Sequence, residues 1–186
     1  MLLDQLKKSS VYTRPFFVIL LCMLILIFSR TLSYIPNFTP TLSLIIFLSF
    51  LIRDKYLAVF IVITSLLVTD FILGFYSSMI FVYSAYIIVC LISYVFLNHR
   101  NLKNVIKLSI SSELLFYLIT NFGVWMMTNT YTSDIYGLYQ CYIAAIPFLK
   151  LSLGSTLIYS ITIYMIFKIV FPGYLRKDGK VYIKSN

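Results

Sequence analysis

The sequence RTLSYIPNFTP, from Arg30 to Pro40, separates two strongly apolar runs and cannot itself be a regular membrane-spanning helix. Pro36 and Pro40 each remove a backbone N–H donor and push the residue before them towards an extended conformation. The arginine, asparagine and threonine side chains of this stretch are costly in hydrocarbon unless they face protein or water. A polar, proline-containing segment at the end of a first membrane helix is therefore a candidate wall of a solute-binding site.

The composition around this stretch indicates an integral membrane protein. Of the 186 residues, 61% are hydrophobic and only 11% are charged, whereas soluble domains are about 45–50% apolar and about 25% charged. The three cysteines, Cys22, Cys90 and Cys141, lie in separate apolar segments without CxxC or Cys/His spacing, which indicates neither a disulfide framework nor a zinc site. His99 is the sole histidine. We therefore expect no metal and no other cofactor.

The hydrophobic pattern predicts a single all-α membrane domain of six transmembrane helices. A polar lead, residues 1–14, precedes the bundle at 15–171, and a basic tail, residues 172–186, follows it. The expected helices cover residues 15–34, 41–52, 56–73, 79–97, 105–127 and 138–171. The second is only 12 residues long, whereas about 20 residues are needed to cross about 30 Å of hydrocarbon. We expect the irregular segment at 35–40 to supply its missing outer part, an arrangement tolerated only where backbone lines a cavity or is covered by protein.

The last hydrophobic run, Leu138 to Phe171, is too long for one span. Its 34 residues correspond to about 51 Å at 1.5 Å per residue. Pro147 and Lys150 divide it, which predicts a short outer helix at 138–146 and a sixth span at 149–171. The expected fold is a bundle with an irregular segment between its first two helices and a broken last helix.

The positions of the basic residues agree with this layout. With the N-terminus inside, all Lys and Arg residues except Arg30 and Lys150 fall on segments assigned to the cytoplasmic side. This asymmetry is the positive-inside rule, and it predicts a multi-pass membrane protein with both termini in the cytoplasm. We expect the protein to lie in the cell (inner) membrane, and the family resemblance described below implies a bacterial source. The net charge of +9 then reflects topology and attraction to the headgroups of the lipid bilayer. Because aromatic and basic residues do not interleave as in single-strand-binding proteins, we expect no nucleic-acid partner.

Polar residues from several helices fall in one layer, the outer third of the membrane. Arg30 and Asp70 lie 16 and 15 residues into helices that run outward, and Lys150 follows Pro147 at the outer start of the final span. We predict a pocket that opens outward at this depth. The candidate substrate-binding residues are Arg30, Asn37, Phe38, Thr39, Asp70, Asn121, Trp125, Gln140, Tyr142 and Lys150.

Each ionisable residue in this set also has a structural interpretation. Arg30 and Asp70 can form an ion pair that orients the bundle, since a charge at membrane depth costs about 2.5–3.5 kcal/mol on insertion scales and favours pairing. Lys150 can extend to the interface with its charged end in water. Glu113, nine residues into the fifth helix, is either a proton-coupling carboxyl group or an acid hydrogen-bonded to its own helix or a neighbouring one.

Four segments support a resemblance to a known family: PNFTP at 36–40, TDFILGF at 69–75, TNFGVW at 120–125 and CYIAAIPF at 141–148. Together they resemble an uncharacterised family of small bacterial multi-pass membrane proteins. That family is more distantly similar to the substrate-binding S components of energy-coupling-factor vitamin transporters. The resemblance implies six helices, and capture of a vitamin or related metabolite at the outer face, partly by the loop at 30–40. One departure is that the first helix, PFFVILLCMLILIFS, lacks the small residues through which S components dock on their transmembrane partner.

The leading functional hypothesis is a membrane-embedded substrate-binding subunit or small carrier for a vitamin-like or related metabolite. Stacking would come from Phe38, Trp125 and Tyr142, and hydrogen bonds from Asn37, Asn121 and Arg30. No GxxxxGK[ST] string occurs in the sequence. Any ATP-driven step would therefore come from a partner, namely a transmembrane and ATPase energising module.

Two other classes of protein stay open. One is a non-catalytic scaffold or assembly subunit of a membrane complex. The other is a membrane-embedded enzyme with Glu113 or Asp70 as acid/base, although the sequence offers no metal cluster, no nucleophile–base pair and no catalytic signature. We therefore expect that the protein is not an enzyme.

Overall fold

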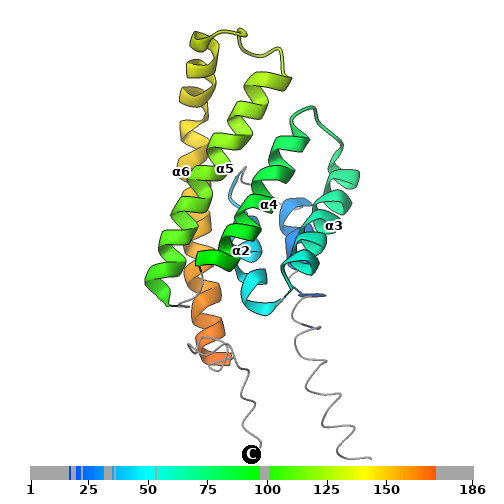
Figure 1. The fold of residues 1–186 in the computed structure, drawn as a ribbon, viewed down its shortest axis with the longest axis vertical. Helices are drawn as coiled ribbons and strands as arrows, with labels where there is room; N and C mark the ends of the chain where they lie inside the picture. The colour runs from blue at the N-terminus through cyan, green and yellow to red at the C-terminus, as the bar shows by residue number, and fades with distance from the viewer. Residues whose placement is uncertain are drawn as a thin grey trace, which may run out of the picture.

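The computed structural model describes residues 17, 20–21, 23–31, 35, 37–52, 54–96 and 101–170. Residues 23–31 are helical, and within the described ranges the chain contains no strand. The helices that follow are α2 (Thr41–Leu51), α3 (Lys55–Leu73), α4 (Met79–Phe96), α5 (Leu102–Met127) and α6 (Ile135–Val170) (Figure 1). The predicted lead at 1–14, the tail at 172–186, Cys22, Pro36 and His99 lie outside the described residues.

The short helix α2 occupies the centre of the bundle. All residues from Thr41 to Ser49 are buried, and α2 packs against α3, α4, α5 and α6. A helix that is covered on every side is apolar all round, which explains why this segment has no polar face. The prediction of a second helix too short to cross a membrane is confirmed, since α2 has 11 residues.

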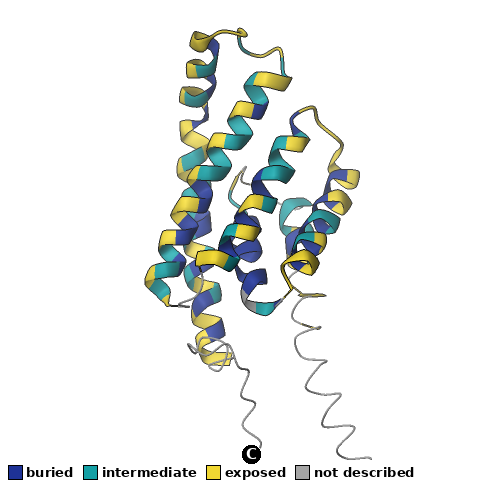
Figure 2. Cartoon of the chain, in the orientation of Figure 1, coloured by how far each residue is buried: buried dark blue, intermediate teal, exposed yellow. Residues whose placement is uncertain are grey.

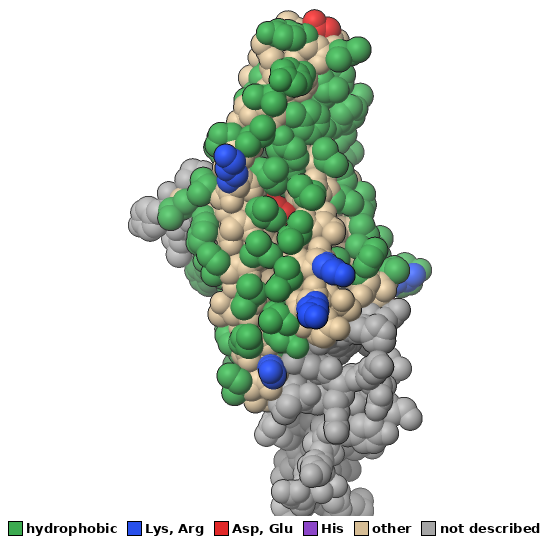
Figure 3. Space-filling model, turned by 90° about the vertical axis from the view of Figure 1, so that its left-hand side faces the viewer, with side chains coloured by type: hydrophobic (Ala, Val, Ile, Leu, Met, Phe, Trp, Pro, Cys, Tyr) green, Lys and Arg blue, Asp and Glu red, His purple; other side chains and the backbone are tan. Residues whose placement is uncertain are grey.

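The other four labelled helices carry the apolar surface of the molecule. In the described part of the chain, α3, α4, α5 and α6 are long and apolar enough to cross a membrane. Large side chains on them face outward, including Phe71 and Ile169, both 79% exposed. Exposed positions run along the outer sides of the helices (Figure 2), and hydrophobic side chains cover most of the face in Figure 3. So extensive an apolar surface requires an apolar solvent, and the chain is a multi-pass membrane protein.

The predicted break in the last helix is wrong. Helix α6 runs without interruption for 36 residues with Pro147 inside it, a length of about 54 Å at 1.5 Å per residue. Proline removes one hydrogen bond of a helix, but a neighbouring helix can compensate in a membrane bundle. Here α5 packs along α6, and the Tyr117 hydroxyl joins the two helices by donating to the Tyr142 carbonyl at 2.6 Å, just before the Ile143 carbonyl that Pro147 leaves without a donor. In Figure 1 this pair of helices extends beyond the α3–α4 pair.

The helix ends fall into two groups (Figure 1). The ends of α2, α4 and α6 and the starts of α3 and α5 share one end of the bundle, and the α3–α4 and α5–α6 connections lie towards the other. Lys55, Lys103, Lys107 and Lys168 all belong to the first group of helix ends. This basic end is the one that the positive-inside rule predicts to be cytoplasmic.

The end of α3 depends on a glycine. Gly74 has φ +97° and donates its N–H to the carbonyl oxygen of Asp70 at 2.8 Å. We expect Gly74→Ala to lower the free energy of unfolding by about 1–2 kcal/mol, because side chains with a Cβ are strained in this backbone region. Thermal unfolding in detergent measures the effect. Ser77→Ala in the same turn is the control, and an equal loss in both variants would contradict the assignment.

Candidate functional site

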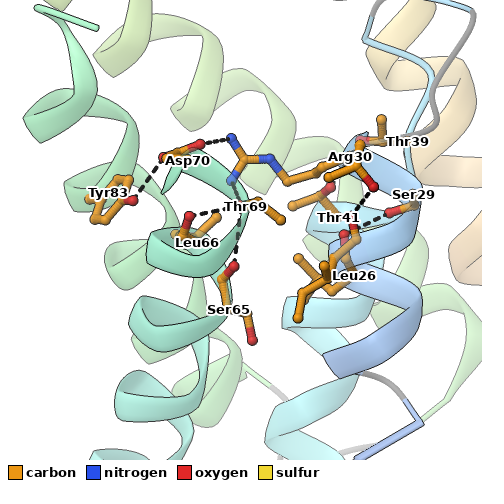
Figure 4. A network of polar contacts seen from close by, with 12 residues as sticks. Leu26, Ser29, Arg30, Thr39, Thr41, Ser65, Leu66, Thr69, Asp70 and Tyr83 are labelled. Carbon is orange, nitrogen blue, oxygen red and sulfur yellow. Dashed lines mark hydrogen bonds and ion pairs between the residues drawn. The ribbon is translucent and has the colours of Figure 1, made fainter. Parts of the chain in front are cut away.

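Arg30 and Asp70 form an ion pair inside the bundle (Figure 4). Arg30 Nη2 lies 2.8 Å from Asp70 Oδ1, and Arg30 Nη1 donates to Thr69 Oγ1 at 2.9 Å. The other carboxylate oxygen, Asp70 Oδ2, accepts a hydrogen bond from the Tyr83 hydroxyl at 2.7 Å. The pair thus joins the helix that contains Arg30 to α3 and α4.

The pair is strongly desolvated. The side chain of Asp70 is 1% exposed and that of Arg30 is 14% exposed. Charges at this burial are tolerated when they are paired and their remaining hydrogen-bonding positions are filled. Nearby, in the turn after α3, burial raises the pKa of the Tyr76 hydroxyl, and the Asp70 carboxylate raises it further. Tyr76 therefore stays protonated at neutral pH.

The segment before α2 is held against α6. Asn37 adopts φ +61°, a conformation that asparagine tolerates better than most residues. The Ser155 hydroxyl lies 3.4 Å from the Asn37 carbonyl oxygen and 3.3 Å from that of Thr39. The hydroxyls of Thr39 and Thr41 are 3.0 Å apart. These contacts place the turn that leads into α2 against α6.

The N-terminus of α2 lies close to Arg30. Pro40 is the N-cap residue and makes no side-chain capping bond. The first N–H groups of a helix have no partner within it and carry partial positive charge. Thr41, the first residue of α2, is buried and lines the same cavity as Arg30. The site therefore combines a guanidinium group with the positive end of a short helix.

A cavity of about 540 Å³ opens at this position. Its walls come from the residues around Arg30, the start of α2, α4 and α5. The lining residues are Arg30, Asn37, Thr39, Thr41, Val82, Tyr86, Phe116 and Thr120. The Tyr86 and Phe116 rings pack together with their centroids 4.6 Å apart. The lining of the cavity thus includes two packed aromatic rings and a set of hydrogen-bonding groups.

A second cavity, of about 160 Å³, lies next to the first and shares Asn37, Phe116 and Thr120 with it. It lies between α5 and α6. Its other lining residues are Glu113, Tyr117, Asn121, Ala145, Phe148, Leu149 and Ser152. Glu113 is 1% exposed and accepts a hydrogen bond from Thr156 Oγ1 at 2.7 Å. A bond from a neighbouring helix is one of the interpretations that the sequence left open for this acid.

The structure brings part of the predicted site together. Arg30, Asn37 and Thr39 line the larger cavity, and Asn37 and Asn121 line the smaller one. Asp70 does not line either cavity and instead holds Arg30 from α3.

The remaining predicted site residues lie elsewhere. Phe38 packs against Tyr159, with ring centroids 5.9 Å apart. Trp125 Nε1 donates to the Thr132 carbonyl at 3.0 Å, and the Tyr142 hydroxyl donates to the Leu118 carbonyl at 2.8 Å. Gln140 and Lys150 are exposed and line neither cavity. These five side chains therefore stabilise loops and helix contacts or face outward.

The sequence interpretation missed several lining residues. Thr41, Tyr86, Phe116 and Thr120 line the larger cavity but were not candidates. Helical spacing could have identified two of them. Glu113, Phe116 and Thr120 follow one another at three and four residues and therefore share one face of α5. Among the described residues, no group of three or more His, Cys, Asp or Glu side chains is arranged to hold a metal ion.

Comparison with protein-family models gives one result that covers most of the chain. The model described as a family of unknown function, DUF6580, matches residues 11–177. The chain belongs to the DUF6580 family. Comparison of this DUF6580 protein with curated proteins and with solved structures gives no match. The resemblance to an uncharacterised family is thereby confirmed.

Proposed function

We propose that this protein is a membrane-embedded substrate-binding subunit or small carrier that takes up a vitamin-like or related small metabolite from outside the cell. The observation that carries the proposal is the cavity of about 540 Å³ beside Arg30, inside a bundle whose outer surface is apolar. Its volume falls within the range of about 300–1,000 Å³ that is usual for small-molecule sites.

The lining of the cavity supports solute binding. Guanidinium, amide and hydroxyl groups are costly at membrane depth, and they mark solute pathways there when they face a cavity. Tyr86 and Phe116 supply an apolar wall, and Arg30, Asn37 and Thr120 supply a few polar groups. A mainly apolar pocket with a small number of fixed polar groups is the usual design of a ligand site.

The proposal also includes a topology of six membrane segments. The helix at 15–34, α2 and α3–α6 together form six segments with cytoplasmic termini, and the turn at 35–40 completes the short α2 at the outer face. This arrangement resembles the S components of vitamin transporters. Any ATP-driven step of uptake would come from a transmembrane and ATPase partner, since the sequence has no phosphate-binding loop of its own.

Binding is tested by removing polar groups that line the cavity without disturbing the backbone. Asn37→Gly keeps the positive φ accessible, and Thr120→Val keeps the side-chain shape while removing a hydroxyl. We expect each variant to weaken retention of the co-purifying metabolite by about tenfold, the equivalent of one lost hydrogen bond of about 1.4 kcal/mol. Mass spectrometry of protein purified in mild detergent measures the retained metabolite.

Thr162→Val is the matched control for this experiment. Thr120 and Thr162 both donate their hydroxyls to the carbonyl four residues earlier, at 2.8 Å, but Thr162 is exposed on α6 and lines neither cavity. We expect it to retain the metabolite as the wild type does. If the protein carries no metabolite and the Thr120 and Asn37 variants stay fully functional in cells, the scaffold function replaces uptake.

A further inference from the structure

Glu113 is a buried acid without a basic partner. It is 1% exposed, lies on α5 and lines the smaller cavity. Thr156 Oγ1 donates to its Oε2 at 2.7 Å, and Ser152 of α6 lines the same cavity. Among the described residues, no Lys, Arg or His lies within ion-pair distance of this carboxyl group.

The other described acids are accounted for within the protein. Asp70 is paired with Arg30 and bonded by Tyr83. Asp54 accepts bonds from the first N–H groups of α3, and Asp134 accepts one from the backbone of Gly137 at the start of α6. Glu113 is thus the one described carboxyl group that is both buried and directed at a cavity without a counter-ion. A buried carboxylate left in this state is costly.

Glu113 and Arg30 line two adjoining cavities. The cavities share three lining residues, Asn37, Phe116 and Thr120, so their spaces adjoin. Tyr86 and Arg30 line the larger cavity, and Glu113 lines the smaller one together with Phe116, which packs on Tyr86. One end of the combined site therefore offers a carboxylate, and the other offers a guanidinium group and the N-terminus of α2.

We infer that the solute carries a positively charged nitrogen that binds Glu113, and a hydrogen-bond acceptor that binds at Arg30 and Thr41. A planar or apolar body of the solute packs on the Tyr86–Phe116 wall between these ends. The inference rests on the proposed function and specifies its substrate class. A hydrogen bond between oppositely charged groups is stronger than one between neutral groups. The negative charge of Glu113 also repels solutes that would bring a negative group to this end of the site.

The test uses wild-type protein in mild detergent and a small-molecule extract of the expression host. Ion exchange divides this extract into cationic, neutral and anionic fractions, and each fraction is added to the protein. We expect only molecules with a positively charged nitrogen, from the cationic fraction or as zwitterions in the neutral fraction, to raise the unfolding temperature and to appear bound in the mass spectrum. This arm needs no variant, so it does not depend on how well a substituted protein folds.

Glu113→Gln then tests the residue itself. Glutamine keeps the shape and still accepts the bond from Thr156, but it cannot carry the negative charge. We expect affinity for the identified cation to fall about tenfold or more, which is the usual cost of losing a charged partner. Asp134→Asn removes an acid outside both cavities and serves as the matched control, with affinity unchanged.

The outcomes separate this inference from the proposed function. Binding only of molecules that have no positively charged nitrogen overturns the charge assignment but leaves solute binding intact. Wild-type affinity of Glu113→Gln for the cation overturns it as well, because a protonated, uncharged Glu113 would give that result. Absence of any bound or stabilising molecule overturns both proposals.

Discussion

Asp70→Asn is expected to lower the free energy of unfolding by about 2–3 kcal/mol. The substitution removes the charge that faces Arg30 at 2.8 Å but keeps side-chain volume. Breaking a buried ion pair by removing one partner costs about 3–5 kcal/mol, because the other charge stays buried and uncompensated. Arg30 borders a cavity and is 14% exposed, so partial hydration reduces the cost to the lower part of this range or just below it.

A second substitution shows that the loss comes from the pair. Arg30→Gln in the Asp70→Asn background removes the stranded positive charge, and we expect it to restore part of the lost stability. Such a double-mutant cycle isolates the coupling between two residues in contact. Unfolding by sodium dodecyl sulfate in mixed micelles, or thermal unfolding in detergent, measures all four proteins.

Asp54→Asn is the control for the loss of an acid. Asp54 is exposed and caps α3 by accepting bonds from the Tyr56 and Leu57 N–H groups, a role that asparagine fills equally well. We expect a change below about 0.5 kcal/mol. A similarly small change for Asp70→Asn, or no recovery in the double variant, would show that the Arg30–Asp70 contact does not stabilise the fold.

The second large effect is expected from Gly123→Ala, which should lower the free energy of unfolding by about 2 kcal/mol. Gly123 is buried on α5 where α4 approaches closely. A Cβ at this position overlaps the Cβ and the first ring atoms of Phe81. The inner end of a side chain cannot move aside without its backbone, and forcing an extra carbon into packed surroundings costs about 1–3 kcal/mol.

Gly154→Ala provides the opposite expectation from the same chemical change. Gly154 lies within α6, and a Cβ there meets no atom within 4 Å. Alanine is favoured over glycine inside a helix by about 0.8–1.0 kcal/mol, so this variant should be slightly more stable than the wild type. Phe81→Ala added to Gly123→Ala should recover part of the loss. If Gly123→Ala raises stability as Gly154→Ala does, a Cβ at position 123 does not clash with Phe81, and the prediction is wrong.

Much of the fold was predictable because it depends on local pattern. The apolar runs located α3, α4 and α5 to within a few residues, and the prolines located the turn before α2. Length alone indicated that α2 could not cross a membrane. Pro147 led to the wrong prediction of a break in the last helix, because whether a proline interrupts a helix depends on the residues that pack around it. Helix α6 continues through Pro147 with α5 packed along it, and no local rule includes that neighbour.

The candidate site was predictable only in part. Depth along the helices placed Arg30, Asn37 and Thr39 at one level, and they do line one cavity. Depth does not say which way a side chain points around its helix, so Gln140 and Lys150, at a similar level, face outward. Glu113 belongs to the adjoining cavity although its sequence depth suggested a separate role.

The sequence by itself determined that this chain is helical, multi-pass and asymmetric in charge, because hydrophobicity, proline and the distribution of lysine and arginine act through local composition and the bilayer. Only the tertiary structure decided which polar groups meet. Arg30 and Asp70 are 40 residues apart in the chain yet form one ion pair. Glu113, in contrast, faces space that no basic side chain of the described residues fills. Which side chains meet depends on how each helix is rotated and packed against the others. That arrangement depends on contacts throughout the bundle and not on any short stretch of sequence.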